Sequence, residues 1–409
     1  MGKTVTVIRH AETNANQERR WQGTTDSGMS RVGFDQIERL AKRFTTLSPD
    51  FVVASDLPRT MRTAEALGGA EPDPEFREFS VGDWEGLTSV EVAERFPVEW
   101  EAFVRGEDVA PGGGEQMSVF RERVGSSFDR LVDRMDDGDH AVLVTHGGVI
   151  WSLMSLVLGL GKGAAMIPSH NTAFSQVIVS GSGERRIEVF NDATHLDEAP
   201  NQFGPEGRHA TFVRHGQSFG NVAGRWDSTT DTDLTELGKE QAALASVHVP
   251  AVKSLYSSPL KRTSQTAEII GAEIGTQTTH DDGLVEMFFG AWEGLTTSEI
   301  LERHGDDIAE FESGNGDDTA RGGNGESLTG AGSRMRDTTH RLSENSVDGS
   351  FVAVSHGAAI RALAVNVLGV QNAGRGKLAI PRNTAQSKLV LTDSTVVLGS
   401  YNVAPHMEA

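Results

Sequence analysis

The sequence predicts an α/β protein made of two tandem domains. Each is a three-layer α/β/α arrangement with a mostly parallel sheet and helices on both faces. Two observations carry this prediction: most of the chain occurs twice in the same order, and within each copy short β-rich apolar runs alternate with helical patterns. Such alternation is typical of sheets covered by helices. A chain of 409 residues is also long for one ordinary domain of ~150 residues.

The repeat is visible in a series of matching blocks. VTVIRHAETNANQERRW near the start returns as ATFVRHGQSFGNVAGRW, and ASDLPRTMRTAEAL returns as SSPLKRTSQTAEII. REFSVGDWEGL, PGGGEQ, VLVTHGGVI and IPSHNTAFSQVIV return as VEMFFGAWEGL, GGNGES, VAVSHGAAI and IPRNTAQSKLVL. Because the blocks keep one order and nearly constant spacing, we interpret the chain as a duplicated domain of about 200 residues, an ordinary domain size.

A connecting segment is expected between the two copies. The stretch DATHLDEAPNQFGPEG combines proline, glycine and acidic residues without periodicity, as linkers do. We therefore expect the first domain over 1–191, a linker over 192–208 and the second domain over 209–409.

The elements expected within each copy place its histidines at strand ends. The apolar runs expected to form strands are Thr4–Ile8, Phe51–Ala54, Ala141–Val144, Ala210–Val213 and Phe351–Val354. Helical patterns cover Leu57–Leu67 and Val149–Leu158. In open α/β sheets, ligands bind beyond the carboxyl ends of the strands. The residues just past a predicted strand are Arg9-His10, His146, Arg214-His215 and His356. Two histidines distant in sequence can therefore share one crevice in each half.

Composition narrows the classes of function. The net charge of -21 argues against nucleic acid or an anionic membrane as a partner. The absence of cysteine excludes disulfides, a thiolate nucleophile and cysteine-based metal sites. The start MGKTVTVIRHAETN lacks the apolar core of a signal peptide, and no apolar run reaches the ~18 residues of a membrane span. We expect a cytoplasmic location.

The repeated residues suit phosphoryl transfer from a monoester. That reaction needs a nucleophile, cations around the phosphoryl oxygens and a proton for the leaving group. An imidazole nitrogen can attack phosphorus and form a phosphohistidine. Guanidinium groups bind phosphate oxygens in pairs and stay charged. A carboxylic acid can supply the proton and then act as the base for water.

The blocks resemble the histidine phosphatase superfamily, which is also called the phosphoglycerate-mutase-like family. Its opening Arg-His-Gly-Glu/Gln-Ser/Thr motif with a following Asn matches Arg9-His10-Ala11-Glu12-Thr13 with Asn16, and Arg214-His215-Gly216-Gln217-Ser218 with Asn221. The family's second arginine matches Arg59 and Arg262. Its glutamate before a Gly-x-Trp-Glu-Gly turn matches Glu78 and Glu286, and the histidine of its His-Gly pair matches His146 and His356. The resemblance covers nearly the whole chain, twice, and implies a phosphoglycerate-mutase-like fold.

The resemblance implies a role for each matched residue. His10 and His215 would be nucleophiles, and Glu78 and Glu286 would be general acids. The groups that hold the phosphoryl oxygens would be Arg9, Arg59 and His146 in the first site and Arg214, Arg262 and His356 in the second. Asn16 and Asn221 would add hydrogen bonds. No metal or other cofactor is expected, because two arginines and a protonated second histidine supply the positive charge.

Other recurring residues are interpreted structurally. Glu85 and Glu293 lie beside tryptophan and glycine in what looks like a tight turn. The stretches Gly112–Gly114 and Gly322–Gly325 could cradle phosphate, but no lysine follows them as a P-loop requires. We favour flexible loops near the mouth of each site.

The two halves differ at a few positions. Ala11 stands where the family usually has glycine, which affects the first site only if that position needs φ > 0. Arg77 precedes Glu78, whereas Val285 precedes Glu286. Two arginines precede Trp21 in the first half, whereas one arginine precedes Trp226 in the second. We hypothesise that the first pocket prefers the more anionic substrate.

The functional expectation is a metal-independent phosphoric monoester hydrolase with two sites that acts on a small phosphorylated metabolite. The alternatives are a phosphoglycerate-mutase-type phosphoryl transfer, a phosphohistidine phosphatase acting on proteins, and a chain with one catalytic and one regulatory or binding domain. Duplication also suggests a monomer whose two domains pair as single-domain relatives do in a dimer.

Overall fold

The computed structural model describes residues 2–45, 47–160, 165–196, 207–313, 316–373, 376–393 and 395–407. Contacts divide the chain into two compact units, Met1–Ala164 with Pro168–Pro200, and Ala165–Ile167 with Asn201–Ala409. Of the predicted linker 192–208, residues 197–206 lie outside the described residues. Its first residue ends strand β6, and its last residue begins strand β7.

The first unit contains a mixed sheet. Its strands, in spatial order, are β3 (Glu71–Pro72), β2 (Phe51–Ala54), β4 (His140–Thr145), β1 (Lys3–Arg9), β5 (Phe174–Val179) and β6 (Arg185–Asp192). The first four are mutually parallel, β5 is antiparallel to β1, and β6 is antiparallel to β5. The prediction of a mostly parallel sheet is confirmed.

The second unit repeats this topology. Its strands are β9 (Thr278–His280), β8 (Leu255–Ser257), β10 (Phe351–Ser355), β7 (Arg208–Arg214), β11 (Gln386–Leu391) and β12 (Val396–Val403). Here too the first four are parallel, and β11 is antiparallel to β7 and β12. All five residues of β10 are buried, as expected for a central strand covered on both faces.

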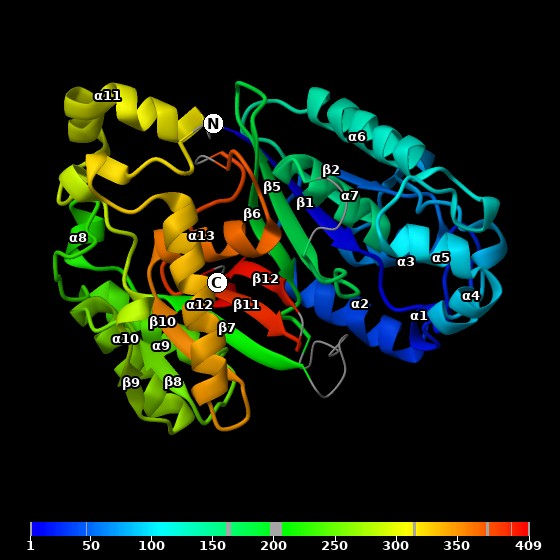
Figure 1. Ribbon diagram of the computed structural model, residues 1–409. Coiled ribbons are helices and arrows are strands. Elements are labelled where there is room, and N and C mark those ends of the chain that lie inside the picture. The colour runs from blue at the N-terminus through cyan, green and yellow to red at the C-terminus, as the bar shows by residue number, and fades with distance from the viewer. Residues whose placement is uncertain are drawn as a thin grey trace. The chain divides into compact units, whose positions relative to one another are not determined.

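Helices cover both faces of each sheet (Figure 1). The first unit has α1 (Asn14–Gln17), α2 (Arg31–Arg43), α3 (Pro58–Ala64), α4 (Ser89–Arg95), α5 (Pro97–Val104), α6 (Met117–Asp133) and α7 (Gly147–Leu158). The second has α8 (Phe219–Val222), α9 (Glu236–Ser246), α10 (Lys261–Ile274), α11 (Thr297–Ser313), α12 (Leu328–Asn345) and α13 (Gly357–Leu368). Helix α6 packs on α7, and α12 packs on α13. No helix within the described ranges is both long and apolar enough to cross a membrane.

The glycine stretches are packed rather than free, which corrects their interpretation as flexible loops. Gly112, with φ +58°, lies so close to the turn Gly82–Trp84 that a Cβ on it would lie 2.3 Å from the Val81 carbonyl oxygen. Gly322, with φ +54°, approaches the turn Gly290–Trp292 in the same way. Only glycine supplies both the positive φ and this closeness. Each stretch therefore anchors the tryptophan-bearing turn that follows the predicted acid.

We predict that Gly112→Ala destabilises the first unit more than Gly113→Ala does. Gly113 also has a positive φ, but a Cβ there meets nothing within 4 Å, so alanine costs about 1–2 kcal/mol from backbone strain alone. At Gly112 the added methyl group also overlaps backbone, which adds roughly 1–3 kcal/mol. Thermal unfolding of the two full-length variants measures the difference. Equal losses of stability would contradict the packing role.

Candidate active sites

The structure places the predicted residues together at the carboxyl end of each sheet. Strands β1 and β4 are parallel neighbours with Arg9 opposite Thr145, so His10 and His146 follow adjacent strands. Their ring centroids lie 5.3 Å apart. In the second unit, β7 and β10 are paired in the same way, and the rings of His215 and His356 are also 5.3 Å apart.

The first histidine of each pair has one nitrogen free for chemistry. His10 Nδ1 lies 2.8 Å from the Ala11 carbonyl oxygen, and His215 Nδ1 lies 2.7 Å from that of Gly216. Because a carbonyl oxygen only accepts hydrogen bonds, Nδ1 carries the proton and Nε2 keeps its lone pair. Burial lowers the pKa of His10 well below the usual range, and Arg59 and Arg9 lower it further. The pKa of His215 is lowered in the same way, so at neutral pH each ring is uncharged and its Nε2 could act as a nucleophile.

Alanine at position 11 is compatible with this geometry. Ala11 is not among the residues with positive φ, and its amide donates to the Thr63 hydroxyl over 2.9 Å. Gly216 is different, because a Cβ there would lie 2.3 Å from the Gly238 carbonyl oxygen. In the second unit glycine is required at this position because there is no space for a Cβ. In the first unit the backbone conformation does not require glycine.

The second arginine of each site is buried and held by backbone carbonyls. Arg59, only 2% exposed, donates to the carbonyl oxygens of Thr25 (2.9 Å) and Gly23 (2.6 Å). Glu85 in turn accepts from the Gly23 amide over 3.0 Å, so it holds the loop that holds the arginine. Arg262 repeats this arrangement with the carbonyl of Thr230 (2.8 Å), whose loop is bound by Glu293.

The second histidine of each site is neutral beside its arginines, whereas the sequence-based expectation is a protonated ring. His146 Nδ1 accepts a hydrogen bond from Arg59 Nε over 3.2 Å, so its proton lies on Nε2, which faces the Ser55 hydroxyl at 2.8 Å. Burial lowers the pKa of His146 well below its usual range, and the charge of Arg59 adds to this effect. His356 has the same relation to Arg262, at 3.3 Å, and the same direction of pKa shift from the same leading causes.

The first arginine of each site keeps a donor without a partner. A terminal N–H of Arg9 donates a hydrogen bond to the Ser169 carbonyl oxygen over 2.5 Å, and one of Arg214 donates to the Pro381 carbonyl oxygen over 2.7 Å. The Nε atoms of both arginines are buried and have no acceptor in the described part of the chain. A buried, unsatisfied guanidinium N–H is costly and is suited to an arriving oxyanion.

The two glutamates are carboxyl groups with raised pKa values. Burial raises the pKa of Glu78, although the Gly148 amide, at 2.9 Å, favours the charged form. Burial likewise raises the pKa of Glu286. Glu286 accepts from three backbone amides, those of Met287, Ala358 and Ala359, at 2.8, 3.2 and 2.8 Å. Each carboxyl group lies at the start of the helix that follows the second histidine.

Two asparagines that the sequence analysis did not single out complete the sites. Asn171 Nδ2 donates to the His10 carbonyl oxygen (2.9 Å) and to Asn16 Oδ1 (3.1 Å). Asn383 makes the same pair of bonds with His215 (2.9 Å) and Asn221 (3.1 Å). A signal for them existed: both lie in the last repeated block, where Asn-Thr-Ala recurs.

The arginines that led to the hypothesis of a more anionic substrate in the first pocket are paired with carboxylates. Arg77 is bound to Asp56 at 2.6 Å and Arg20 to Glu18 at 2.8 Å, so these charges are neutralised. The second site opens to a cavity of about 170 Å³, whose lining includes Arg225, Arg361 and Asp227 together with the apolar side chains of Met287, Phe289, Phe311 and Ile380. No cluster of three or more potential metal ligands occurs within the described residues.

Comparison with known proteins gives a consistent result. The family described as the histidine phosphatase superfamily (branch 1) matches residues 5–193 and 210–404. Phosphoglycerate mutase-like protein 4 of Arabidopsis thaliana is 32% identical over 47% of this chain and 87% of its own length. Glucosyl-3-phosphoglycerate phosphatase of Mycolicibacterium vanbaalenii is 33% identical over 39% and 75%. Phosphoserine phosphatase 1 of Hydrogenobacter thermophilus is 31% identical over 39% and 75%.

We predict that Glu78→Gln, in a chain whose second site is silenced by His215→Ala, lowers kcat/KM for alkyl phosphates by about 10²–10⁴-fold, because a general acid contributes on that order. p-Nitrophenyl phosphate, whose leaving group needs no proton, should lose far less. With Glu78 intact, kcat/KM should fall as pH rises through the raised pKa of this carboxyl group, and the glutamine variant should lack that limb. Equal losses for both substrates would contradict the role.

Proposed function

Because the chain belongs to the histidine phosphatase superfamily, we propose that it hydrolyses small phosphomonoester metabolites, without a metal, at two active sites. The observation that carries this proposal is the recurrence of one arrangement in both units: an uncharged histidine with Nε2 free, two arginines and a buried carboxyl group. The intact second arrangement argues against a purely regulatory second domain.

In the first step, His10 Nε2 attacks phosphorus as the bond to the leaving oxygen breaks. Glu78 gives its proton to that oxygen, which departs as an alcohol. The products are a phosphohistidine and a carboxylate. In the second step, Glu78 takes a proton from water, the water oxygen attacks phosphorus, and the N–P bond breaks. Inorganic phosphate leaves, and both residues return to their starting states. His215 and Glu286 act alike in the second site.

Positive charge around the phosphoryl oxygens comes from the two arginines of each site. Arg9 and Arg214 offer their unpartnered Nε–H groups, and Arg59 and Arg262 lie beside the second histidine. An anion at this position favours protonation of His146 and His356. The added proton goes to Nδ1, so the Nε–H of Arg59 or Arg262 must leave that nitrogen and turn to the anion.

The relatives include phosphatases and phosphoglycerate mutase-like proteins, so a mutase is the second candidate. A mutase would return the phosphoryl group from histidine to another hydroxyl of the substrate. Water must reach the phosphohistidine in a phosphatase and must be excluded in a mutase. Release of inorganic phosphate, as opposed to formation of an isomer from 3-phosphoglycerate, separates the two.

We predict that His10→Ala and His215→Ala each remove part of the phosphatase activity, and that the double variant abolishes it. Removing one nucleophile leaves the other site intact, because each unit holds a complete set of groups. The measurement is release of phosphate, with no added metal, from a panel that includes phosphoserine, 3-phosphoglycerate and sugar phosphates. Acid-labile phosphate on the protein should disappear with the double variant. Full activity in either single variant would disprove two working sites.

We further predict that the two sites rank substrates differently. A second anionic group should favour the second site, because two further arginines, Arg225 and Arg361, outnumber Asp227 in the lining of its cavity. A charged hydrogen bond contributes about 1.5–3 kcal/mol, so the preference should be on the order of tenfold or more. The ratio of kcat/KM for 3-phosphoglycerate to that for glycerol 3-phosphate, measured in the His10→Ala and His215→Ala chains, gives the result. Identical ratios would contradict the prediction.

A further inference from the structure

One short loop in each unit contacts several phosphate-binding groups at once. The first is the loop 169–172, before β5. Its Ser169 carbonyl oxygen accepts a hydrogen bond from the Arg9 guanidinium, and its Asn171 side chain donates one to the His10 carbonyl oxygen. The Thr172 amide donates to the Arg9 carbonyl over 3.0 Å. The loop Pro381–Thr384, before β11, makes the corresponding contacts in the second unit. We call these two segments the anchor loops.

Each anchor loop ends in a strained threonine. Thr172 has φ +60° and Thr384 has φ +58°, a conformation that is an outlier for a β-branched residue. Both are completely buried. Such strain costs on the order of 1–3 kcal/mol and persists only where surrounding contacts enforce it. Its occurrence at the same position in both units points to a requirement of the site.

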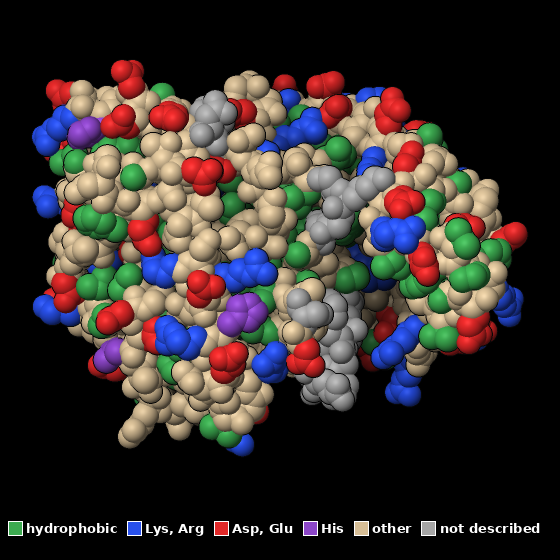
Figure 2. All heavy atoms as spheres, in the orientation of Figure 1, with side chains coloured by type: hydrophobic (Ala, Val, Ile, Leu, Met, Phe, Trp, Pro, Cys, Tyr) green, Lys and Arg blue, Asp and Glu red, His purple; other side chains and the backbone are tan. Residues whose placement is uncertain are grey.

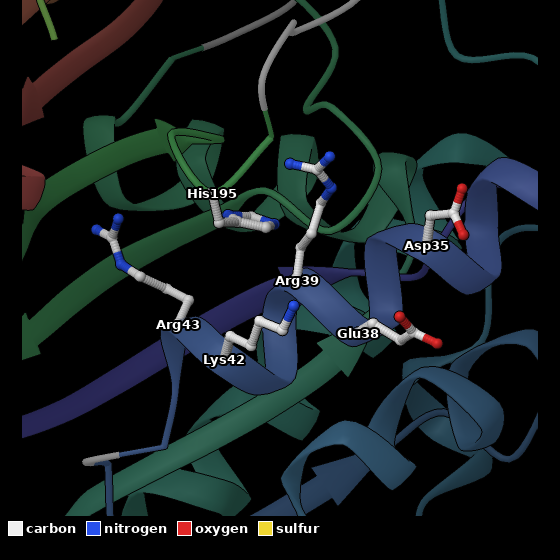
Figure 3. A pocket seen from close by; sticks show the side chains of 6 residues that line it. All are labelled: Asp35, Glu38, Arg39, Lys42, Arg43 and His195. Carbon is white, nitrogen blue, oxygen red and sulfur yellow. The ribbon is translucent and has the colours of Figure 1, made fainter.

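A partly buried histidine supports each threonine. His195 Nε2 lies 2.9 Å from the Thr172 hydroxyl, and His406 Nε2 lies 2.7 Å from that of Thr384. Figure 3 shows His195 beside α2, near Arg39 and Arg43. Burial lowers the pKa of His195 to about 4, against the attraction of Asp192, and these arginines lower it further. The ring is therefore uncharged at neutral pH, and its bond to Thr172 does not change there.

The geometry fixes which way two amides point. The His10 carbonyl can only accept, so Asn171 presents its Nδ2 group there. The second hydrogen of that group points to Asn16, which must therefore present its oxygen. The Thr13 amide donates to the same oxygen at 3.3 Å. Asn16 Nδ2 is consequently turned away from Asn171 and is left to bind the phosphoryl group. Asn383 orients Asn221 in the same way.

We propose that Asn171 and Asn383 are positioning residues: each uses one amide group to hold both the backbone of the nucleophilic histidine and the orientation of Asn16 or Asn221. This inference rests on the proposed phosphatase function. Neither residue contacts the reacting atoms. Aspartate at these positions has the same shape but no donor, so it would break both bonds and let the partner amide rotate.

The test is a double-mutant cycle in the full-length His215→Ala chain. Asn171→Ala, Asn171→Asp and Asn16→Ala are made singly, and each Asn171 variant is combined with Asn16→Ala. We expect Asn171→Asp to lower kcat/KM on the order of 10–100-fold, approaching the loss of one oxyanion donor. In the Asn16→Ala background the further loss should be under threefold, because residues that act through one another are not additive. A merely structural role, or charge repulsion from aspartate, would persist in that background.

The matched control is Asn14→Asp. Asn14 lies on helix α1 together with Asn16 and is exposed. Its side chain donates to the Ser27 carbonyl oxygen. It receives the same isosteric change and should keep its activity within twofold. Activity of Asn171→Asp within twofold of its parent, or effects of Asn171 and Asn16 that multiply, would overturn the inference. Thermal melting identifies a variant that has not folded. The mirror set at Asn383 and Asn221 in the His10→Ala chain then decides.

The failure of this inference can be told apart from failure of the proposed function. If the parent chain releases no phosphate from any substrate, the function fails, and the affinity for inorganic phosphate measured by calorimetry replaces kcat/KM. The same double-mutant cycle is then measured on that affinity. If Asn171→Asp weakens phosphate binding and its effect does not add to that of Asn16→Ala, positioning is supported. If Asn171→Asp leaves the affinity unchanged, positioning is rejected.

Discussion

Each site confines two guanidinium groups and two imidazoles in a buried space, and this concentration of positive charge governs its chemistry. The arginines keep their charge because backbone carbonyls surround them. The histidines lose theirs, because protonation beside an arginine in a buried place is unfavourable. The acidic side chains behind the overall charge of -21 are scattered over the face drawn in Figure 2, whereas the site arginines are bound by backbone carbonyl oxygens. The sites are thus poised for an anion, whose arrival balances the charge.

Much of the fold could be predicted because the duplication doubles every signal. Strand Phe51–Ala54 has the predicted bounds, and the others differ by a residue or two at their ends. The positions of His10 and His215 follow from apolar runs that end in Arg-His. The packing of Gly112 could not be predicted, because its neighbour is a carbonyl more than thirty positions away in the chain, and nothing local to the glycine run indicates a close contact.

The protonation states and hydrogen-bond orientations were also beyond the sequence. Whether His146 is charged depends on its burial and on Arg59, which comes from a distant helix. The position of the Asn171 amide, between the His10 carbonyl and Asn16, joins groups that are distant in the chain. His195 lies in the predicted linker because the stretch around it has no periodicity, yet His406 holds the equivalent place near the other end of the chain. Single residues such as these two histidines can hold equivalent positions in both units, although no periodic pattern in the sequence indicates it.

The contrast between Ala11 and Gly216 bears on how the two halves can diverge. A methyl group at position 11 is already accommodated, whereas at position 216 it would collide with the backbone of Gly238. The second half can follow the first at this position only after the first turn of α9, which contains Gly238, has moved. After a duplication, the two copies therefore differ in which substitutions they tolerate first. A backbone shift in one copy allows side chains there that the unshifted backbone of the other copy still excludes.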